Sequence, residues 1–87
     1  MFYTYILQSQ KDNKFYTGYT KDLKTRFIKH NSGLVTSTKN RAPFNLIYYE
    51  ACLNQQDATD REKFLKSGQG KRYLKNRIKK FLKSKLC

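Results

Sequence analysis

Two tyrosine-rich segments near the start of the chain constrain its fold most strongly. Residues 2–8 read FYTYILQ and residues 15–20 read FYTGYT, and both are rich in the aromatic and β-branched residues that favour strands. The polar stretch between them, SQKDNK, has the composition and length of a hairpin turn. The pattern predicts an antiparallel hairpin, and Gly18 inside its second strand predicts a bulge or a close approach by another group.

The length of 87 residues limits the chain to one small domain, expected to span residues 1–87. Separate recognition and catalytic domains would not fit, so any active site must be built into the layers that form the core. Cys52 and Cys87 lack metal-ligand spacing, and no disulfide framework is expected. The sequence shows neither a signal peptide nor an apolar run near 18 residues, which predicts a cytoplasmic protein.

The charge balance indicates a polyanionic partner. Nineteen Lys and Arg against six Asp and Glu give a net charge of +13, and no acidic residue follows Glu62. Such a field attracts nucleic acid by releasing its condensed counterions. Two alternatives stay open: the lysines only keep a small protein in solution, or they contact an anionic membrane, although no tryptophan anchors the basic segment. Nucleic acid is the favoured partner class.

A helix, a loop and a third strand are expected after the hairpin. Residues 20–33 have helical periodicity, with Thr20 as the predicted N-cap. Residues 34–43 predict a polar, basic loop. Residues 45–53, NLIYYEACL, include a continuous apolar run, which predicts a central strand covered on both faces.

Two further helices complete the chain. The first is predicted over residues 54–68, with Asn54 as its cap and Gly68 as its terminator. The second is predicted over residues 71–85 and is strongly basic, with an apolar side. The order β-β-α-β-α-α predicts an α+β fold, a small α/β sandwich in which helices flank a three-stranded, mostly antiparallel sheet.

Polar side chains occupy helix positions that should face the core. Arg26 and His30 lie three and seven positions after Leu23, on one face of the first predicted helix. Glu62 lies four positions after Ala58, on the inward stripe of the second helix. Buried charges must be paired or must line a cleft. They form either an ion pair between Arg26 and Glu62, with His30 as a satisfied core histidine, or a phosphate-handling site.

With these features, the sequence of residues 2–83 resembles the GIY-YIG endonucleases, in particular the small stand-alone bacterial members. Tyr3 stands where the family signature has glycine, and Thr4 and Thr17 stand at aliphatic positions, changes that strands tolerate. The resemblance rests on YTY at residues 3–5, YTG at residues 16–18, Arg26 and His30 in LKTRFIKHN, and Glu62 in DREKFLKSG.

The resemblance implies metal-dependent hydrolysis of phosphodiester bonds in DNA. Glu62 would be the protein ligand of one Mg²⁺ (or Mn²⁺) ion, and Arg26 would bind the scissile phosphate. Tyr16 would accept the proton of the attacking water, although a phenol with its free pKa of about 10 needs nearby positive charge to act as a base. Tyr5 would orient water or phosphate, and His30 would share proton handling or position Tyr16.

Other residues are expected to contact nucleic acid without reading its sequence. Gly18 would let the DNA backbone or a tyrosine approach closely. The family also has an asparagine after its glutamate, and the candidate here, Asn76, falls near the basic side of its helix and receives no role. The expected contact residues are Gly18, Lys39, Arg41, Lys71, Arg72 and Lys75.

A second reading of the same residues also stays open. The chain would then be a non-catalytic or partner-dependent nucleic-acid-binding module with a vestigial nuclease site. This alternative has weight because catalytic relatives gain affinity and specificity from an added domain, a role that a separate targeting protein would fill here. The sequence does not distinguish damaged, branched or other DNA from RNA, and it leaves the oligomeric state open.

Overall fold

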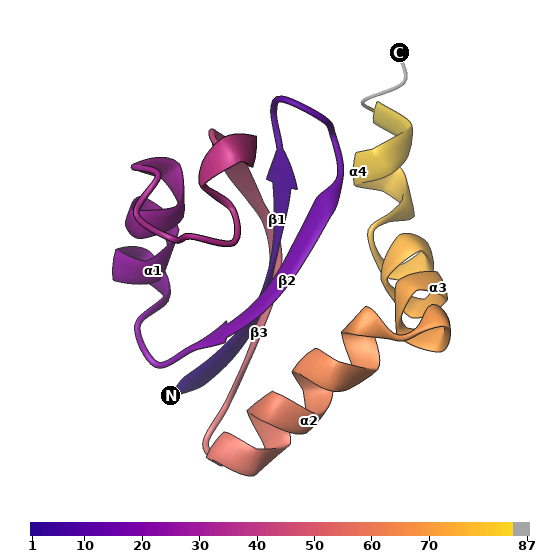
Figure 1. The fold of residues 1–87 in the computed structure, drawn as a ribbon. Coiled ribbons are helices and arrows are strands. Elements are labelled where there is room, and N and C mark those ends of the chain that lie inside the picture. The colour runs from indigo at the N-terminus through magenta and orange to yellow at the C-terminus, as the bar shows by residue number, and fades with distance from the viewer. Residues whose placement is uncertain (85–87) are drawn as a thin grey trace.

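The structure is a computed structural model and describes residues 1–84. The predicted order β-β-α-β-α-α is confirmed, with the last predicted helix divided in two and a short 3-10 helix in the predicted loop (Figure 1). The predicted helix end at Lys85, and also Cys87, lie outside the described residues. The elements are β1 (Phe2–Ser9), β2 (Phe15–Thr20), α1 (Leu23–Asn31), η1 (Lys39–Arg41), β3 (Phe44–Cys52), α2 (Gln55–Lys66), α3 (Gly68–Arg77) and α4 (Lys79–Ser84).

The three strands lie in the order β2-β1-β3, and both pairings are antiparallel. The prediction of a central third strand is wrong, because β1 is central and β3 forms an edge. A β-bulge explains the misleading pattern: Leu46 pairs with Leu7 and Tyr48 pairs with Ile6, which leaves Ile47 as an extra residue. The side chain of Leu46 joins one core cluster, whereas Ile47 and Tyr48 join the other. The apolar run therefore marks a bulge on an edge strand.

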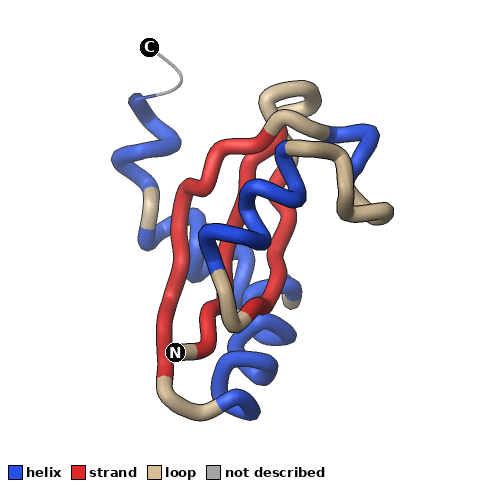
Figure 2. The backbone as a smooth tube through the Cα atoms, turned by 90° about the vertical axis from the view of Figure 1, so that its left-hand side faces the viewer, coloured by secondary structure: helices blue, strands red, loops and turns tan. Residues whose placement is uncertain are grey.

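Each face of the sheet has its own apolar core. On one face α1 covers a cluster that includes Tyr5 and Leu7. On the other face Ile6 packs with Leu65 of α2 and Leu74 of α3. Figures 1 and 2 show α1 on one side of the sheet and α2 and α3 on the other. Alternate residues of the central strand thus supply both cores, and the predicted sandwich is confirmed.

Short polar side chains begin α1 and α2, as expected for helix starts. The prediction of Thr20 as the cap of α1 is wrong, because the backbone N–H of Thr25 donates to the Asp22 carboxylate at 3.1 Å. The Thr20 hydroxyl accepts the backbone N–H of Asp22 at 3.1 Å and supports the preceding turn. Asn54 caps α2, as predicted.

The predicted basic helix begins earlier than residue 71 and is interrupted. Ile78 leaves helical geometry, with φ −112° and ψ 27°, and separates α3 from α4. Among the helices of residues 1–84, none is long and apolar enough to cross a membrane. Cys52 is a free thiol.

The junction between α2 and α3 is tight. Ser67 follows the last residue of α2, and its hydroxyl accepts the backbone N–H of Gly70 at 3.1 Å, which caps α3. The prediction of Gly68 as a terminator is therefore wrong, since Gly68 is the first residue of α3. A Cβ at Gly70 would collide with the backbone carbonyl of Phe64, so the close approach of the two helices requires glycine there.

Replacing Gly70 with alanine is expected to lower the free energy of unfolding by about 2 kcal/mol, because the new Cβ must displace the backbone of α2. Gly68→Ala is the matched control, since no atom lies within 4 Å of its Cβ position. Its stability should equal or slightly exceed that of the unchanged protein. Urea unfolding followed by circular dichroism measures both changes, and equal stability of the two variants would contradict the tight junction.

Candidate active site

Tyr5 lies at the centre of the candidate site. It belongs to the central strand β1, is only 1% exposed, and pairs with Gly18 of β2. A Cβ at Gly18 would collide with the Tyr5 hydroxyl, so the phenol lies directly across the glycine. Of the two groups expected to approach Gly18, the structure places a tyrosine there. The missing side chain on the edge strand makes room for the phenol.

His30 of α1 holds the Tyr5 hydroxyl from within the core. Its Nε2 lies 2.8 Å from that hydroxyl, and its Nδ1 lies 2.8 Å from the Thr38 hydroxyl. The Thr38 hydroxyl lies 3.5 Å from the carbonyl of Val35, which favours the tautomer in which Nδ1–H donates to Thr38 and Nε2 accepts from Tyr5. Burial, aided by the Arg26 charge, lowers the pKa of His30 to about 4. The imidazole is therefore neutral at pH 7.

Arg26, also on α1, brings a positive charge to the same phenol. Burial raises the pKa of Tyr5, and the neighbouring Arg26 guanidinium opposes that rise. The Arg26 Nε is buried and has no hydrogen-bond partner within the described part of the chain. A buried donor left without a partner costs about 1–3 kcal/mol. Such a group beside Tyr5 indicates a place for an anionic ligand.

Glu62 acts on the phenol from α2, which packs on the other face of the sheet, through its negative charge. Burial is the main cause of the raised pKa of Tyr5, and Tyr16 and Glu62 contribute further to it. The Glu62 side chain is 22% exposed, and the ammonium group of Lys66 lies 3.0 Å from its carboxylate. The first helix, the second helix and the hairpin therefore all bring a polar group to Tyr5.

The ion pair between Arg26 and Glu62, one of the two expectations for these residues, is not formed. Among residues 1–84, Glu62 pairs with Lys66, and the other ion pairs do not involve Arg26. Arg61 of α2 instead binds Glu50 of β3 through two hydrogen bonds of 2.8 and 3.1 Å. Among the described residues, Arg41 and Arg61 thus have carboxylate partners, whereas Arg26 has none.

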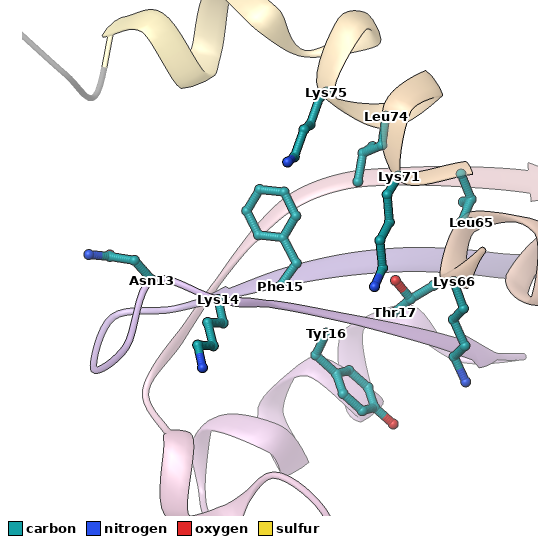
Figure 3. A pocket seen from close by; sticks show the side chains of 10 residues that line it. All are labelled: Asn13, Lys14, Phe15, Tyr16, Thr17, Leu65, Lys66, Lys71, Leu74 and Lys75. Carbon is teal, nitrogen blue, oxygen red and sulfur yellow. The ribbon is translucent and has the colours of Figure 1, made fainter. Parts of the chain in front are cut away.

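Tyr16 and Tyr19 point to opposite faces of β2, as strand alternation predicts. The Tyr16 ring centroid lies 6.3 Å from that of Tyr5 and 5.0 Å from that of His30. Tyr19 stacks on Phe2 at 6.4 Å. Figure 3 shows the Tyr16 hydroxyl directed away from the strand. Of these tyrosines, Tyr5 is the one that is hydrogen-bonded to His30, although the His30 and Tyr16 rings also lie close together.

The residues predicted to contact nucleic acid, apart from Gly18, lie on two elements, η1 and α3. On η1, Lys39 is exposed, whereas Arg41 is half-buried and pairs with Asp12 of the hairpin turn at 3.1 Å. Arg41 therefore ties two loops together. The predicted contact residues on α3 are all exposed, and they are Lys71, Arg72 and Lys75.

The sequence is similar to known proteins over most of its length. Residues 1–76 match the model of the GIY-YIG catalytic domain. The chain belongs to the GIY-YIG family. It is 44% identical over 81 residues to a UPF0213 protein of Pediococcus acidilactici, an alignment that covers 86% of this chain and 82% of the relative. A UPF0213 protein of Staphylococcus saprophyticus is 40% identical over 74 residues, which cover 84% and 89% of the two chains. No solved structure is significantly similar.

Glu62 is the residue of this GIY-YIG domain that the sequence predicts as a metal ligand, and its side chain is 22% exposed. Within residues 1–84, no three His, Cys, Asp or Glu side chains gather into a metal-binding group. One carboxylate fits Mg²⁺, which prefers oxygen ligands and keeps several water molecules instead of requiring a cage of protein ligands. An ion held by Glu62 would have to displace Lys66 from that carboxylate.

Two residues of the site, Thr38 and Lys66, are not among those predicted from the sequence. Thr38 lies in the loop after α1, and only the fold brings it to His30, so no sequence signal marks it. Lys66 follows Glu62 by four positions in a helix, a spacing at which opposite charges pair, so this contact is predictable. Asn76, the candidate for the asparagine of the GIY-YIG family, is exposed on α3.

The stability of this GIY-YIG domain is expected to depend on pH through His30. The pKa of His30 is about 4 in the folded protein and 6.5 without its surroundings, so the unfolded state binds more protons between these values. The free energy of unfolding should therefore fall as the pH falls through this interval, by about 3 kcal/mol in total. Urea unfolding at a series of pH values from 7 to 4 measures the loss.

His30→Gln separates this effect from other titrations. Glutamine keeps a polar side chain but does not ionise, so the variant should lack the part of the pH dependence that comes from His30. The gap in unfolding free energy between the two proteins should narrow as the pH falls from 7 to 4. Parallel curves would show that His30 is not a buried neutral group.

Proposed function

We propose that this protein is a metal-dependent endonuclease that hydrolyses phosphodiester bonds in DNA. The observation that carries the proposal is the buried Nε of Arg26, which lies beside the Tyr5 phenol and has no hydrogen-bond partner among residues 1–84. The charge of Glu62 also acts on that phenol. Membership of the GIY-YIG family makes nuclease chemistry the expectation for such a cluster. The net charge of +13 supports a nucleic-acid substrate.

In the proposed reaction, water attacks the phosphorus atom and the bond to the 3′ oxygen breaks. That oxygen takes a proton from a solvent water molecule and leaves as a hydroxyl. Arg26 binds the phosphate, because its planar set of donors suits phosphate oxygens and stabilises the charge that develops there. Tyr16, in its phenolate form, accepts the proton from the attacking water and becomes a neutral phenol. Tyr5, with its hydroxyl hydrogen directed to His30, offers its oxygen to orient the water.

Glu62 is the residue that would hold one Mg²⁺ or Mn²⁺ ion. When bound, such an ion would stabilise the negative charge on the phosphate and on the leaving oxygen. Lys66 would exchange its place at Glu62 for a contact with the DNA backbone, because it lies at the same edge of the sheet and is half exposed.

The remaining basic residues would bind the phosphates on either side of the scissile bond. Lys71, Arg72 and Lys75 extend from α3, and Lys39 extends from η1. These contacts would place the DNA without reading its sequence. Arg41 would contribute less, since Asp12 already neutralises it.

One observation favours a second candidate, a nucleic-acid-binding module without catalysis that acts with a separate targeting protein. The ion pair between Glu62 and Lys66 places an ammonium group at the proposed metal ligand. If that pair persists, the protein would bind nucleic acid with a steep salt dependence and cleave no duplex, branched or single-stranded substrate at any Mg²⁺ concentration.

Nicking of supercoiled plasmid DNA in Mg²⁺ tests the endonuclease directly. Glu62→Gln and Tyr16→Phe should each lower the nicking rate by about 100-fold or more, because one removes the metal ligand and the other removes the proton acceptor. Asp60→Asn is the matched control, since it removes an exposed carboxylate from the same helix. This variant should cleave like the unchanged protein. Equal rates for all four proteins would indicate a contaminating nuclease and sink the proposal.

A further inference from the structure

A groove of about 570 Å³ lies between the edge strand β2 and the helices α2 and α3 (Figure 3). Its volume lies within the range of about 300–1,000 Å³ that is usual for sites of small molecules. Three apolar side chains, Phe15, Leu65 and Leu74, contribute to its lining, and Figure 3 shows the Phe15 ring projecting between the strand and α3. An apolar surface of this kind can accept a flat, uncharged group.

Four lysines surround this apolar surface, namely Lys14, Lys66, Lys71 and Lys75. No acidic side chain is among the residues that line the groove. Among residues 1–84, Lys66 pairs with Glu62, and the other three lysines form no ion pair. The groove therefore suits a ligand that combines an apolar face with several negative charges.

The groove continues into the candidate active site. Tyr16, the proposed proton acceptor, lies on its wall, and Lys66 joins its rim to the Glu62 carboxylate. A ligand held in the groove would therefore lie next to the phosphate that Arg26 binds. A nucleotide adjoining the scissile phosphate has the required chemistry, since its base is flat and its phosphates are anionic.

We propose that the groove holds one unpaired nucleotide of the substrate strand, with its base stacked on Phe15 and its flanking phosphates bound by Lys71 and Lys75. The base must be unpaired, because a base within a duplex keeps its faces covered by neighbours and cannot enter a groove between a strand and a helix. This inference rests on the proposed function. It assigns to the enzyme a substrate that carries an unpaired base beside the cleaved bond.

Oligonucleotides that carry the fluorescent base 2-aminopurine test the proposal without cleavage, in buffer with EDTA. Two 24-base-pair DNA probes differ only in whether the 2-aminopurine is paired or lies opposite an abasic site. The unpaired probe should bind about tenfold more tightly, and stacking on Phe15 should quench its fluorescence. Phe15→Leu should lose the quenching and most of the preference, whereas Phe15→Tyr should retain both.

Phe2→Leu is the matched control for the aromatic ring. Phe2 lies near the far end of β1, six positions from Gln8, the residue that pairs with Phe15. Phe2→Leu should keep both the preference for the unpaired probe and the quenching of its fluorescence. Unfolding midpoints of all variants show whether each is folded at the temperature of the binding assay.

The lysines are tested by the salt dependence of binding. Lys71→Ala combined with Lys75→Ala should lower the slope of log K against log salt by about 1.8, as expected for two phosphate contacts to a DNA duplex. Lys24→Ala combined with Lys29→Ala removes the same charge from the exposed side of α1 and should leave the slope nearly unchanged. Equal slopes in both double variants would contradict phosphate binding at the rim.

Several results would overturn the inference. One is equal affinity for the paired and unpaired probes, and another is unaltered quenching in Phe15→Leu. A further competitor is an acidic peptide with aromatic side chains. If this peptide displaces the unpaired probe at a lower concentration than competing DNA does, the groove would be assigned to a protein partner instead. Plasmid nicking keeps the two proposals apart: cleavage without a preference for the unpaired probe refutes the groove alone, and that preference without cleavage refutes the nuclease alone.

Discussion

The hydrogen bond between Tyr5 and His30 joins the parts of the molecule that form the site. Tyr5 belongs to the central strand, and its phenol crosses the edge strand only because Gly18 has no side chain. The Nε2 of His30 is hydrogen-bonded to that hydroxyl, and its Nδ1 is hydrogen-bonded to the Thr38 hydroxyl. These two bonds fix α1 and the loop after it relative to the sheet. This placement in turn carries Arg26 to the phenol. A buried, neutral histidine can do this because hydrogen bonds satisfy both of its nitrogens.

The charges of the site are held at the edge of a sheet whose two faces carry separate cores. The first helix supplies Arg26 from one face, and the second helix supplies Glu62 from the other. The carboxylate has Lys66 as a partner, whereas the buried Nε of Arg26 has none within the described residues. The lysine-rimmed groove starts at the same edge. Phosphate chemistry and binding of the neighbouring nucleotide would therefore use one continuous surface, as expected for a domain too small to divide these tasks.

Local patterns in the sequence predict much of this arrangement. Alternation assigns Tyr16 and Tyr19 to opposite faces of their strand, and helical spacing turns Arg26 and His30 inward, because side-chain direction in a regular element depends on spacing alone. The failures involve contacts between distant segments. The bulge at Ile47 makes an edge strand resemble a central one, and the place of Gly68 depends on the closeness of two helices. Thr38 carries no local signal because its partner lies eight residues away in a different element.

The sequence by itself determined the hairpin, the order of the elements, the basic charge and the family to which the chain belongs. These properties follow from composition and from short-range spacing, which do not depend on how the elements pack. Only the tertiary structure decided which acidic residue pairs with which basic one. Arg61 pairs with Glu50 because the packing of α2 against β3 brings the two side chains within hydrogen-bond distance, whereas Arg26 has no acidic partner among residues 1–84. The free energy of a buried charge depends on that distance and on the loss of water around it, and neither is encoded in local sequence.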